Sequence, residues 1–274
     1  MLGQVVFIVW RESIEALLVV GILFAWLGKN PQFAEGRKYL WLGVAGGVLA
    51  ALSLGAVLLW FSDWLEGERE DYFQIGMMLV AAALIVQMVF WMRKHGRTLK
   101  RELEQGLGRH AESARWWGMA LLVMIAITRE GSETVVFLYG MGLGQAGLQW
   151  WYFVAAAALG FALALGTFQL LQLGGKVFSW QHFFRFTEFL LLLLASAMIV
   201  NSVERMIGLG WLPALVDPLW DSSMILDDAT RVGGIVAALT GYRSHPALML
   251  LLLLAGYWAF IAAGVYRLGR AKAA

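Results

Sequence analysis

The chain has no cysteine, which excludes disulfides and thiolate metal sites. Its four histidines lie in loops or at the edges of apolar segments. Charged residues make up only 15% of the 274 residues, whereas hydrophobic residues make up 60%. The hydrophobic residues fall in blocks of about 20, the length that an α-helix needs to cross a lipid bilayer. The sequence therefore predicts an all-α, polytopic membrane protein.

Seven blocks are long enough to be transmembrane helices. They cover residues 4–27, 38–62, 72–92, 117–141, 149–173, 183–207 and 246–268. Once Arg11, Arg129 and Arg205 are set aside, fifteen of the remaining eighteen Lys and Arg fall on one side of the membrane, which is cytoplasmic by the positive-inside rule. The N-terminus is then outside and the C-terminus inside. We expect the first block to be a retained helix, because no basic region precedes it and it contains a charge.

One charged pattern, Arg-Glu-x-x-Glu, occurs twice, at residues 11–15 and 129–133. Each copy lies within a block that is otherwise apolar. An ionisable side chain at the centre of a transmembrane helix costs about 2.5–3.5 kcal/mol on insertion scales. Three such groups offset most of the contribution of the surrounding apolar side chains, so a helix that served only as an anchor would not carry them. The pattern therefore indicates a functional site.

The two copies belong to the first and fourth blocks and so run through the membrane in opposite directions. A second match, between residues 81–87 and 195–201, has an offset of 114 residues, close to the 118 of the motif. We therefore predict two inverted three-helix repeats, about 4–92 and 117–207, then an external loop, 208–245, and the final helix. This layout is typical of transporters. Small residues at every fourth position in the second and fifth blocks predict close helix packing.

The two glutamates of each motif are three residues apart and share one helix face. If the first and fourth helices face each other, four carboxylates surround one point, an all-oxygen site that suits a hard cation. These carboxylates belong to Glu12, Glu15, Glu130 and Glu133. Arg11 and Arg129 balance part of their charge, and the six groups sum to −2. The alternative is that each motif is an intrahelical salt bridge that only stabilises the bundle.

Other metal chemistries fit the sequence less well. A di-iron enzyme in a helix bundle needs Glu-x-x-His pairs, and zinc carriers usually use imidazole or thiolate. The blocks offer neither arrangement. A copper(I) site would need methionine clusters, and we interpret the pair Met88 and Met92 as core packing.

With two Arg-Glu-x-x-Glu motifs in the first and fourth of seven blocks, the chain resembles the oxidase-coupled iron permease family. This family includes the fungal high-affinity iron permeases and the bacterial Efe-type permeases. The second copy has the commoner family form, Arg-Glu-Gly-x-Glu, whereas Ser13 replaces that glycine in the first. The resemblance implies uptake of iron, often delivered as Fe³⁺ by an oxidase or a periplasmic binding protein.

Five further polar residues are candidates for an ion pathway: Gln74, Gln87, Glu188, Asn201 and Glu204. The repeat offset aligns Gln74, near the outer end of the third block, with Glu188, near the cytoplasmic end of the sixth, so we predict entry and exit positions. Alternatively, Glu188 pairs with Arg185, and Glu204 pairs with Arg205. The external loop contains four aspartates that either recruit cations or a partner or are simply solvated: Asp217, Asp221, Asp227 and Asp228.

The sequence thus predicts a permease of the bacterial inner membrane that moves iron as Fe³⁺, or as Fe²⁺ oxidised on delivery. We expect contact with the lipid bilayer, a periplasmic iron-binding or iron-oxidising partner, no nucleic acid and no organic cofactor. A divalent-cation carrier of other specificity is the main alternative. An intramembrane carboxylate metalloenzyme and a receptor or scaffold are further ones.

Overall fold

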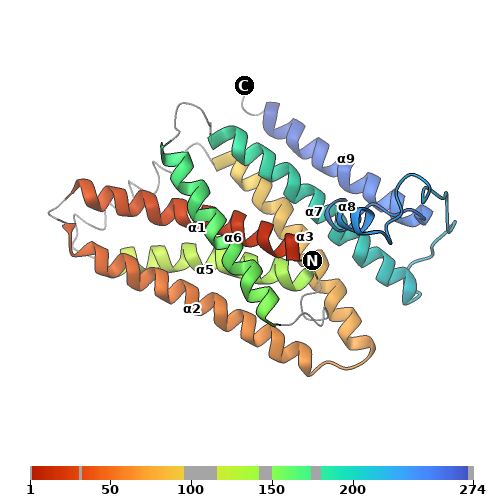
Figure 1. Ribbon diagram of the computed structural model, residues 1–274, viewed down its shortest axis with the longest axis horizontal. Coiled ribbons are helices and arrows are strands. Elements are labelled where there is room, and N and C mark those ends of the chain that lie inside the picture. The colour runs from red at the N-terminus through yellow and green to blue at the C-terminus, as the bar shows by residue number, and fades with distance from the viewer. Residues whose placement is uncertain (1, 31–32, 96–115, 142–149, 174–179, 271–274) are drawn as a thin grey trace.

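The computed structural model describes residues 2–30, 33–95, 116–141, 150–173 and 180–270 (Figure 1). Every regular element in these ranges is a helix, which confirms the predicted all-α class. The helices are α1 (Leu2–Lys29), α2 (Gly36–Asp63), α3 (Glu68–His95), α5 (Trp116–Gly140), α6 (Trp150–Leu173), α7 (Trp180–Gly208), α8 (Arg231–Thr240) and α9 (Leu248–Arg270). Residues 96–115, whose Lys and Arg contribute to the predicted orientation, lie outside the described ranges.

Each apolar block corresponds to one long helix, with bounds that differ by a few residues. The largest difference is at α3, which begins at Glu68 instead of residue 72. Its first turn contains Glu68, Glu70 and Asp71. Carboxylates at this end of a helix interact favourably with the exposed backbone N–H groups and the helix dipole. The helix therefore extends beyond its apolar part into a polar turn.

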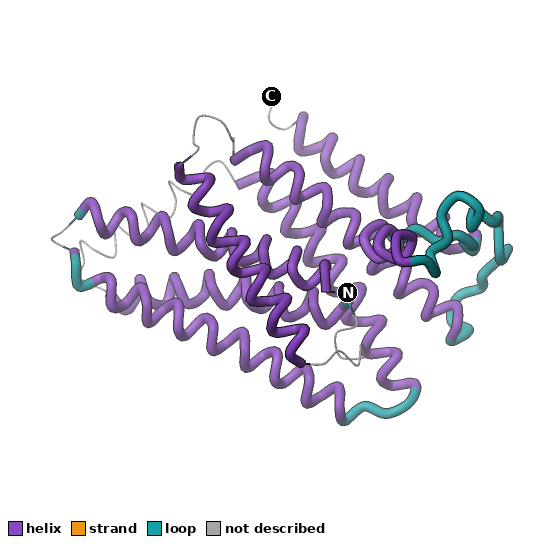
Figure 2. Tube along the Cα trace, viewed as in Figure 1, coloured by secondary structure: helices purple, strands orange, loops and turns teal. Residues whose placement is uncertain are grey.

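The segment 208–245, which the sequence analysis predicts to be an external loop, contains a short helix, α8. The Thr230 hydroxyl caps α8 by accepting from the Gly233 N–H at 3.1 Å, and Gly241 ends it with a left-handed φ of 76°. Figure 2 shows α8 among the loops at one end of the molecule. Gln4 of α1 donates to the carbonyl of Ala238 at 2.7 Å, which ties α8 to the bundle.

Five helices within the described ranges are long and apolar enough to span a membrane, namely α2, α3, α6, α7 and α9. Helices α1 and α5 are not in this group, although they contain 28 and 25 residues. Each carries the three charged side chains of one motif, which is more than an ordinary apolar span contains. The charged side chains of the motif therefore make α1 and α5 less apolar than an ordinary transmembrane helix.

Small residues join the helices into close pairs, as the sequence predicts. A Cβ atom at Gly43 of α2 would lie 2.5 Å from the carbonyl oxygen of Ala120 of α5, and one at Gly47 would lie 2.6 Å from Ile127 Cβ. In the same way, α6 approaches α1 at Gly160, where an added Cβ would lie 2.7 Å from a carbonyl oxygen of α1. Helices α2 and α5 therefore pack backbone to backbone, and so do α1 and α6 (Figure 1).

Helices α3 and α7 pack against each other and complete the core with α1 and α5. The largest cluster of buried apolar side chains includes Ile8, Ile85, Phe137 and Leu194, one from each of these four helices. In contrast, α2, α6 and α9 expose large apolar side chains, such as Leu52, Trp151 and Phe260, on their outer faces. An apolar exterior around a more polar interior is the arrangement expected in a bilayer.

Candidate metal centre

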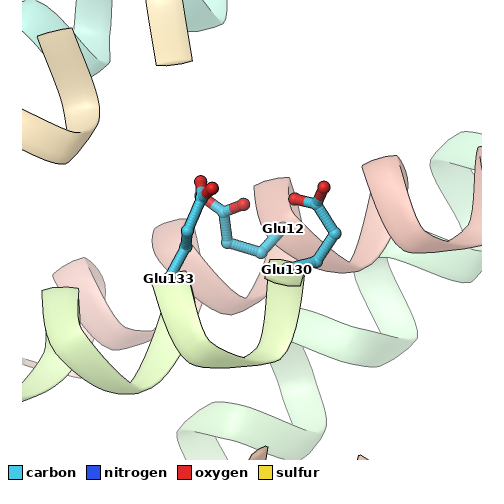
Figure 3. A group of neighbouring side chains, drawn as sticks. All are labelled: Glu12, Glu130 and Glu133. Carbon is cyan, nitrogen blue, oxygen red and sulfur yellow. The ribbon is translucent and has the colours of Figure 1, made fainter. Parts of the chain in front are cut away.

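The two motifs lie near the middle of α1 and α5, where these helices face each other. Figure 3 shows Glu12 of α1 and Glu130 and Glu133 of α5 with their carboxylates directed into the same space. One carboxylate oxygen from each of the three residues lies within 4.8 Å of the other two. Glu12 is 2% exposed and Glu133 is 8% exposed. Residues more than a hundred positions apart thus form one buried acidic group.

Several oxygens of this group lack partners among the described residues. The buried Oε2 atoms of Glu12, Glu130 and Glu133 accept no hydrogen bond there. A buried polar atom normally has a partner, and an ionised one without a partner is especially costly. Three unpartnered carboxylate oxygens directed at one space therefore favour a cation as the missing partner.

The spacing of the oxygens is close to that of a coordination shell. Metal–carboxylate bonds are about 2.0–2.2 Å long, so adjacent ligand oxygens lie about 3 Å apart and opposite ones about 4.3 Å apart. The three oxygens lie no more than 4.8 Å apart, so their separations are near these values. Small movements of the side chains would therefore close the three carboxylates around one ion.

Arg11 neutralises the glutamates of its own motif from a fully enclosed position. It is 2% exposed, its Nη1 donates to Glu12 Oε1 at 2.6 Å, and its Nη2 pairs with Glu15 Oε1. Nη1 also donates to the sulfur of Met88 on α3 at 2.8 Å. Glu15 is not part of the group of three carboxylates. The structure therefore brings three of the four predicted ligands together and leaves the fourth paired with Arg11.

Arg129 has different surroundings although its motif is the same. Its side chain is 40% exposed, and its Nε donates to Glu133 Oε1 at 3.0 Å. Its guanidinium carbon lies 4.6 Å from the ring centre of Trp91 on α3, a cation–π contact. Among the described residues Glu130 forms no ion pair. The second motif thus holds its carboxylates less tightly than the first.

The predicted exit residue Glu188 is buried in α7 and pairs with Arg93 of α3, with Arg93 Nε 2.9 Å from Glu188 Oε2. The pair expected with Arg185 is replaced by this contact between helices. The predicted entry residue Gln74 is 2% exposed and donates to the carbonyl of Tyr139 at 3.2 Å, near the end of α5. Gln74 therefore satisfies backbone groups at a helix end, which is a structural role.

Asn201 and Glu204 bind Arg243 of the segment 208–245 instead of lining the site. Both oxygens of Glu204 accept from Arg243, at 2.5 and 2.8 Å, and Asn201 Oδ1 accepts from the same guanidinium at 2.6 Å. The neighbouring Arg205 pairs with Asp71 of α3 at 2.8 Å. Each residue of the expected Glu204–Arg205 pair therefore has a charged partner elsewhere in the fold. The clamp around Arg243 fixes the end of the external segment to α7.

Three of the four aspartates of the segment 208–245 accept hydrogen bonds from residues of the same segment. The bonds run from Ser223 N to Asp221 Oδ1 at 2.9 Å, from Ala229 N to Asp227 Oδ1 at 2.8 Å and from Ser244 Oγ to Asp228 Oδ1 at 2.5 Å. Hydrogen bonds from the two serines lower the pKa values of Asp221 and Asp228. Asp217 is exposed. Within the described ranges, none of the four joins the carboxylate group of α1 and α5.

Two residues of α3 contact the arginines of the motifs. Met88 packs in the core, as the sequence predicts, and its sulfur also accepts from Arg11, while Trp91 contacts Arg129. Their spacing of three residues places both on one face of α3, which is the signal that could have linked them. Gln87, in contrast, is exposed. The structure therefore does not support Gln87 as a residue that lines an interior pathway.

Known proteins match most of the chain. The family model described as "Iron permease FTR1 family" matches residues 1–267. The chain is 27% identical over 242 residues to "Ferrous iron permease EfeU" of Escherichia coli O157:H7, covering 88% of this chain and 86% of that protein. It is 26% identical over 246 residues to the protein of the same name from Yersinia pestis, covering 87% and 84%. No solved structure matches.

These matches agree with the buried carboxylates and the apolar helices. They confirm the prediction of a multi-pass protein of the bacterial inner membrane that transports iron and is not an enzyme. They also confirm the resemblance inferred from the two motifs. The chain belongs to the iron permease FTR1 family.

Proposed function

We propose that this protein moves iron across the membrane through the carboxylate group formed by Glu12, Glu130 and Glu133. The observation that carries the proposal is the set of three buried Oε2 atoms without partners, in a group whose ligand oxygens lie within 4.8 Å. Glu15 joins as the fourth ligand when the cation draws it away from Arg11. The site then uses both motifs, so damage to either one disables the same step.

We further propose seven transmembrane helices, with the N-terminus outside and the C-terminus inside. Helix α1 has 28 residues and α5 has 25, which corresponds to lengths of about 42 and 38 Å, enough to cross the hydrocarbon core. The packing of α2 on α5 has its counterpart in the packing of α6 on α1. This correspondence supports two inverted repeats, with α9 added at the end.

The charge of the site suggests how it loads and unloads. With four carboxylates and two guanidiniums, the empty group has a net charge of −2, which Fe²⁺ would neutralise and Fe³⁺ would exceed by one. Incoming iron competes with Arg11 and Arg129 for the same oxygens. When the ion leaves, the arginines re-form their ion pairs and lower the cost of the empty site. The arginines therefore act as tethered counter-ions that exchange with the cargo.

We propose Glu188 as the next binding position of the ion after the carboxylate group. It is buried near the cytoplasmic end of α7, and it pairs with Arg93 in the same way that the motif glutamates pair with their arginines. On the outer side, we propose delivery of iron by a periplasmic iron-binding or iron-oxidising protein, as the family resemblance implies. The external segment that contains α8 is the surface available for such a partner.

Uptake of radioactive iron into cells that express Glu130→Gln tests the site. Glutamine keeps the size of the side chain but removes the charge, so we expect uptake to fall to background while the amount of protein is unchanged. Glu35→Gln, at an exposed position before α2, is the matched control and should transport normally. Wild-type uptake by Glu130→Gln would contradict the proposed site.

Two further conditions separate the alternatives. Parallel assays with iron kept as Fe²⁺ by ascorbate and as Fe³⁺ by citrate identify the form of the cargo. Competition by excess Mn²⁺ or Zn²⁺ distinguishes an iron permease from a broader divalent-cation carrier. If an excess of either competitor abolishes iron uptake, the protein is a broader divalent-cation carrier and the proposed selectivity for iron is wrong.

A further inference from the structure

The two arginines of the motifs have the same sequence context but different surroundings, and α3 causes the difference. Arg11 pairs with both glutamates of its motif, whereas Arg129 pairs with Glu133 and rests on the ring of Trp91. The 114-residue offset of the repeat places Arg205 on α7 at the position that corresponds to Trp91. The second half of the chain therefore offers no ring at the matching position. One aromatic side chain distinguishes the two copies.

The ring restricts what the guanidinium of Arg129 can reach. An arginine can direct two parallel N–H groups at one carboxylate, or bridge two carboxylates as Arg11 does. With its guanidinium carbon 4.6 Å from the centre of the Trp91 ring, Arg129 donates to Glu133 from Nε. Glu130 forms no ion pair among the described residues. The ring thus holds the guanidinium to one side of the carboxylates instead of between them.

We propose that Trp91 is a positioning residue that keeps Arg129 away from Glu130 and so leaves that carboxylate available for the cation. This inference rests on the proposed function, because it concerns the affinity of the same site. Without the ring, Arg129 moves between Glu130 and Glu133, and the cation must displace it. The empty state gains an ion pair that the loaded state lacks, so the affinity for the cation falls.

Equilibrium binding of radioactive Fe²⁺ to the purified full-length protein in detergent, without oxygen, tests the inference. For Trp91→Leu we expect a Kd several-fold to about tenfold higher, because the ring no longer draws the guanidinium of Arg129 away from Glu130. Trp91→Phe keeps an aromatic face and should give an intermediate Kd. Trp151→Leu, at an exposed position on α6, is the matched control and should bind like the wild type.

A second pair of variants separates positioning from packing. In protein that already carries Arg129→Gln, Trp91→Leu should leave the Kd unchanged, because the residue through which the ring acts is absent. An equal loss of affinity in both backgrounds would mean that Trp91 only packs, and would overturn the inference. The same conclusion follows if Trp91→Leu binds iron like the wild type. If the wild type itself binds no iron, the proposed function fails instead.

Discussion

Replacement of Arg11 by glutamine should destabilise the protein far more than the same replacement of Arg129. Arg11 is 2% exposed and pairs with two carboxylates, so its loss leaves two buried anions without their counter-ion. Breaking a buried pair in this way costs about 3–5 kcal/mol. Arg129 pairs with one carboxylate and is 40% exposed, and screening by solvent reduces the expected cost to about 1 kcal/mol or less.

These costs correspond to clearly different melting temperatures. For a protein of this size, 1 kcal/mol shifts the melting temperature by about 2–4 °C. We therefore expect a decrease on the order of 10 °C for Arg11→Gln and of at most about 4 °C for Arg129→Gln. Thermal unfolding of the purified proteins in one detergent, followed by far-ultraviolet circular dichroism, measures both shifts. Arg267→Gln, at an exposed position near the end of α9, is the control.

Added iron provides an internal check on the cause. A ligand that binds only the folded state at 100 times its Kd stabilises that state by about 2.7 kcal/mol. Arg11→Gln should recover most of its lost stability with iron, because the cation replaces the missing positive charge. Equal decreases for the two arginine variants in the absence of iron would refute the reasoning, since burial and the number of paired carboxylates would then not set the cost.

Two other predictions concern the scaffold. Gly131→Val should lower iron uptake, because a side chain at this position collides with Ala51 of α2. Overpacking of this kind costs about 1–3 kcal/mol. Gly256→Ala is the control and should transport like the wild type, because an added Cβ there meets nothing within 4 Å. Normal uptake by Gly131→Val, at normal protein levels, would show that the close packing of α2 does not position Glu130. Arg243→Gln should make the segment 208–245 more sensitive to added protease, because Glu204 and Asn201 lose their common partner; unchanged cleavage would contradict the clamp.

The long helices could be predicted from the sequence because each consists of an apolar block of the length that crosses a bilayer. The first turn of α3 was missed because its residues are polar, and α8 was missed because its ten residues lie inside a polar segment. Thr230 and Gly241 were the available signals for α8, since they have the residue types that begin and end helices. Such signals are weak without an apolar block between them.

The convergence of Glu12, Glu130 and Glu133 could also be predicted, because it follows from helical spacing and from the repetition of the motif. The pairs Arg11–Glu15 and Arg129–Glu133 follow from the same spacing, but the difference between the surroundings of the two arginines could not be predicted. It depends on Met88 and Trp91 of α3, far away in the sequence, and nothing within either motif shows that α3 packs there. The motif therefore identifies the candidate ligands, while contacts with α3 determine how the arginine of each motif is placed beside them.

The close packing of α2 on α5 and of α1 on α6 has a consequence for movement during transport. Within each pair, backbones touch across glycines such as Gly47 and Gly160, so sliding would create steric collisions. The carboxylates lie where one pair meets the other. If a cation binds there, as proposed, its contacts with carboxylates of both pairs would draw the two pairs together. The transported ion would then bring the two helix pairs together around its own binding site.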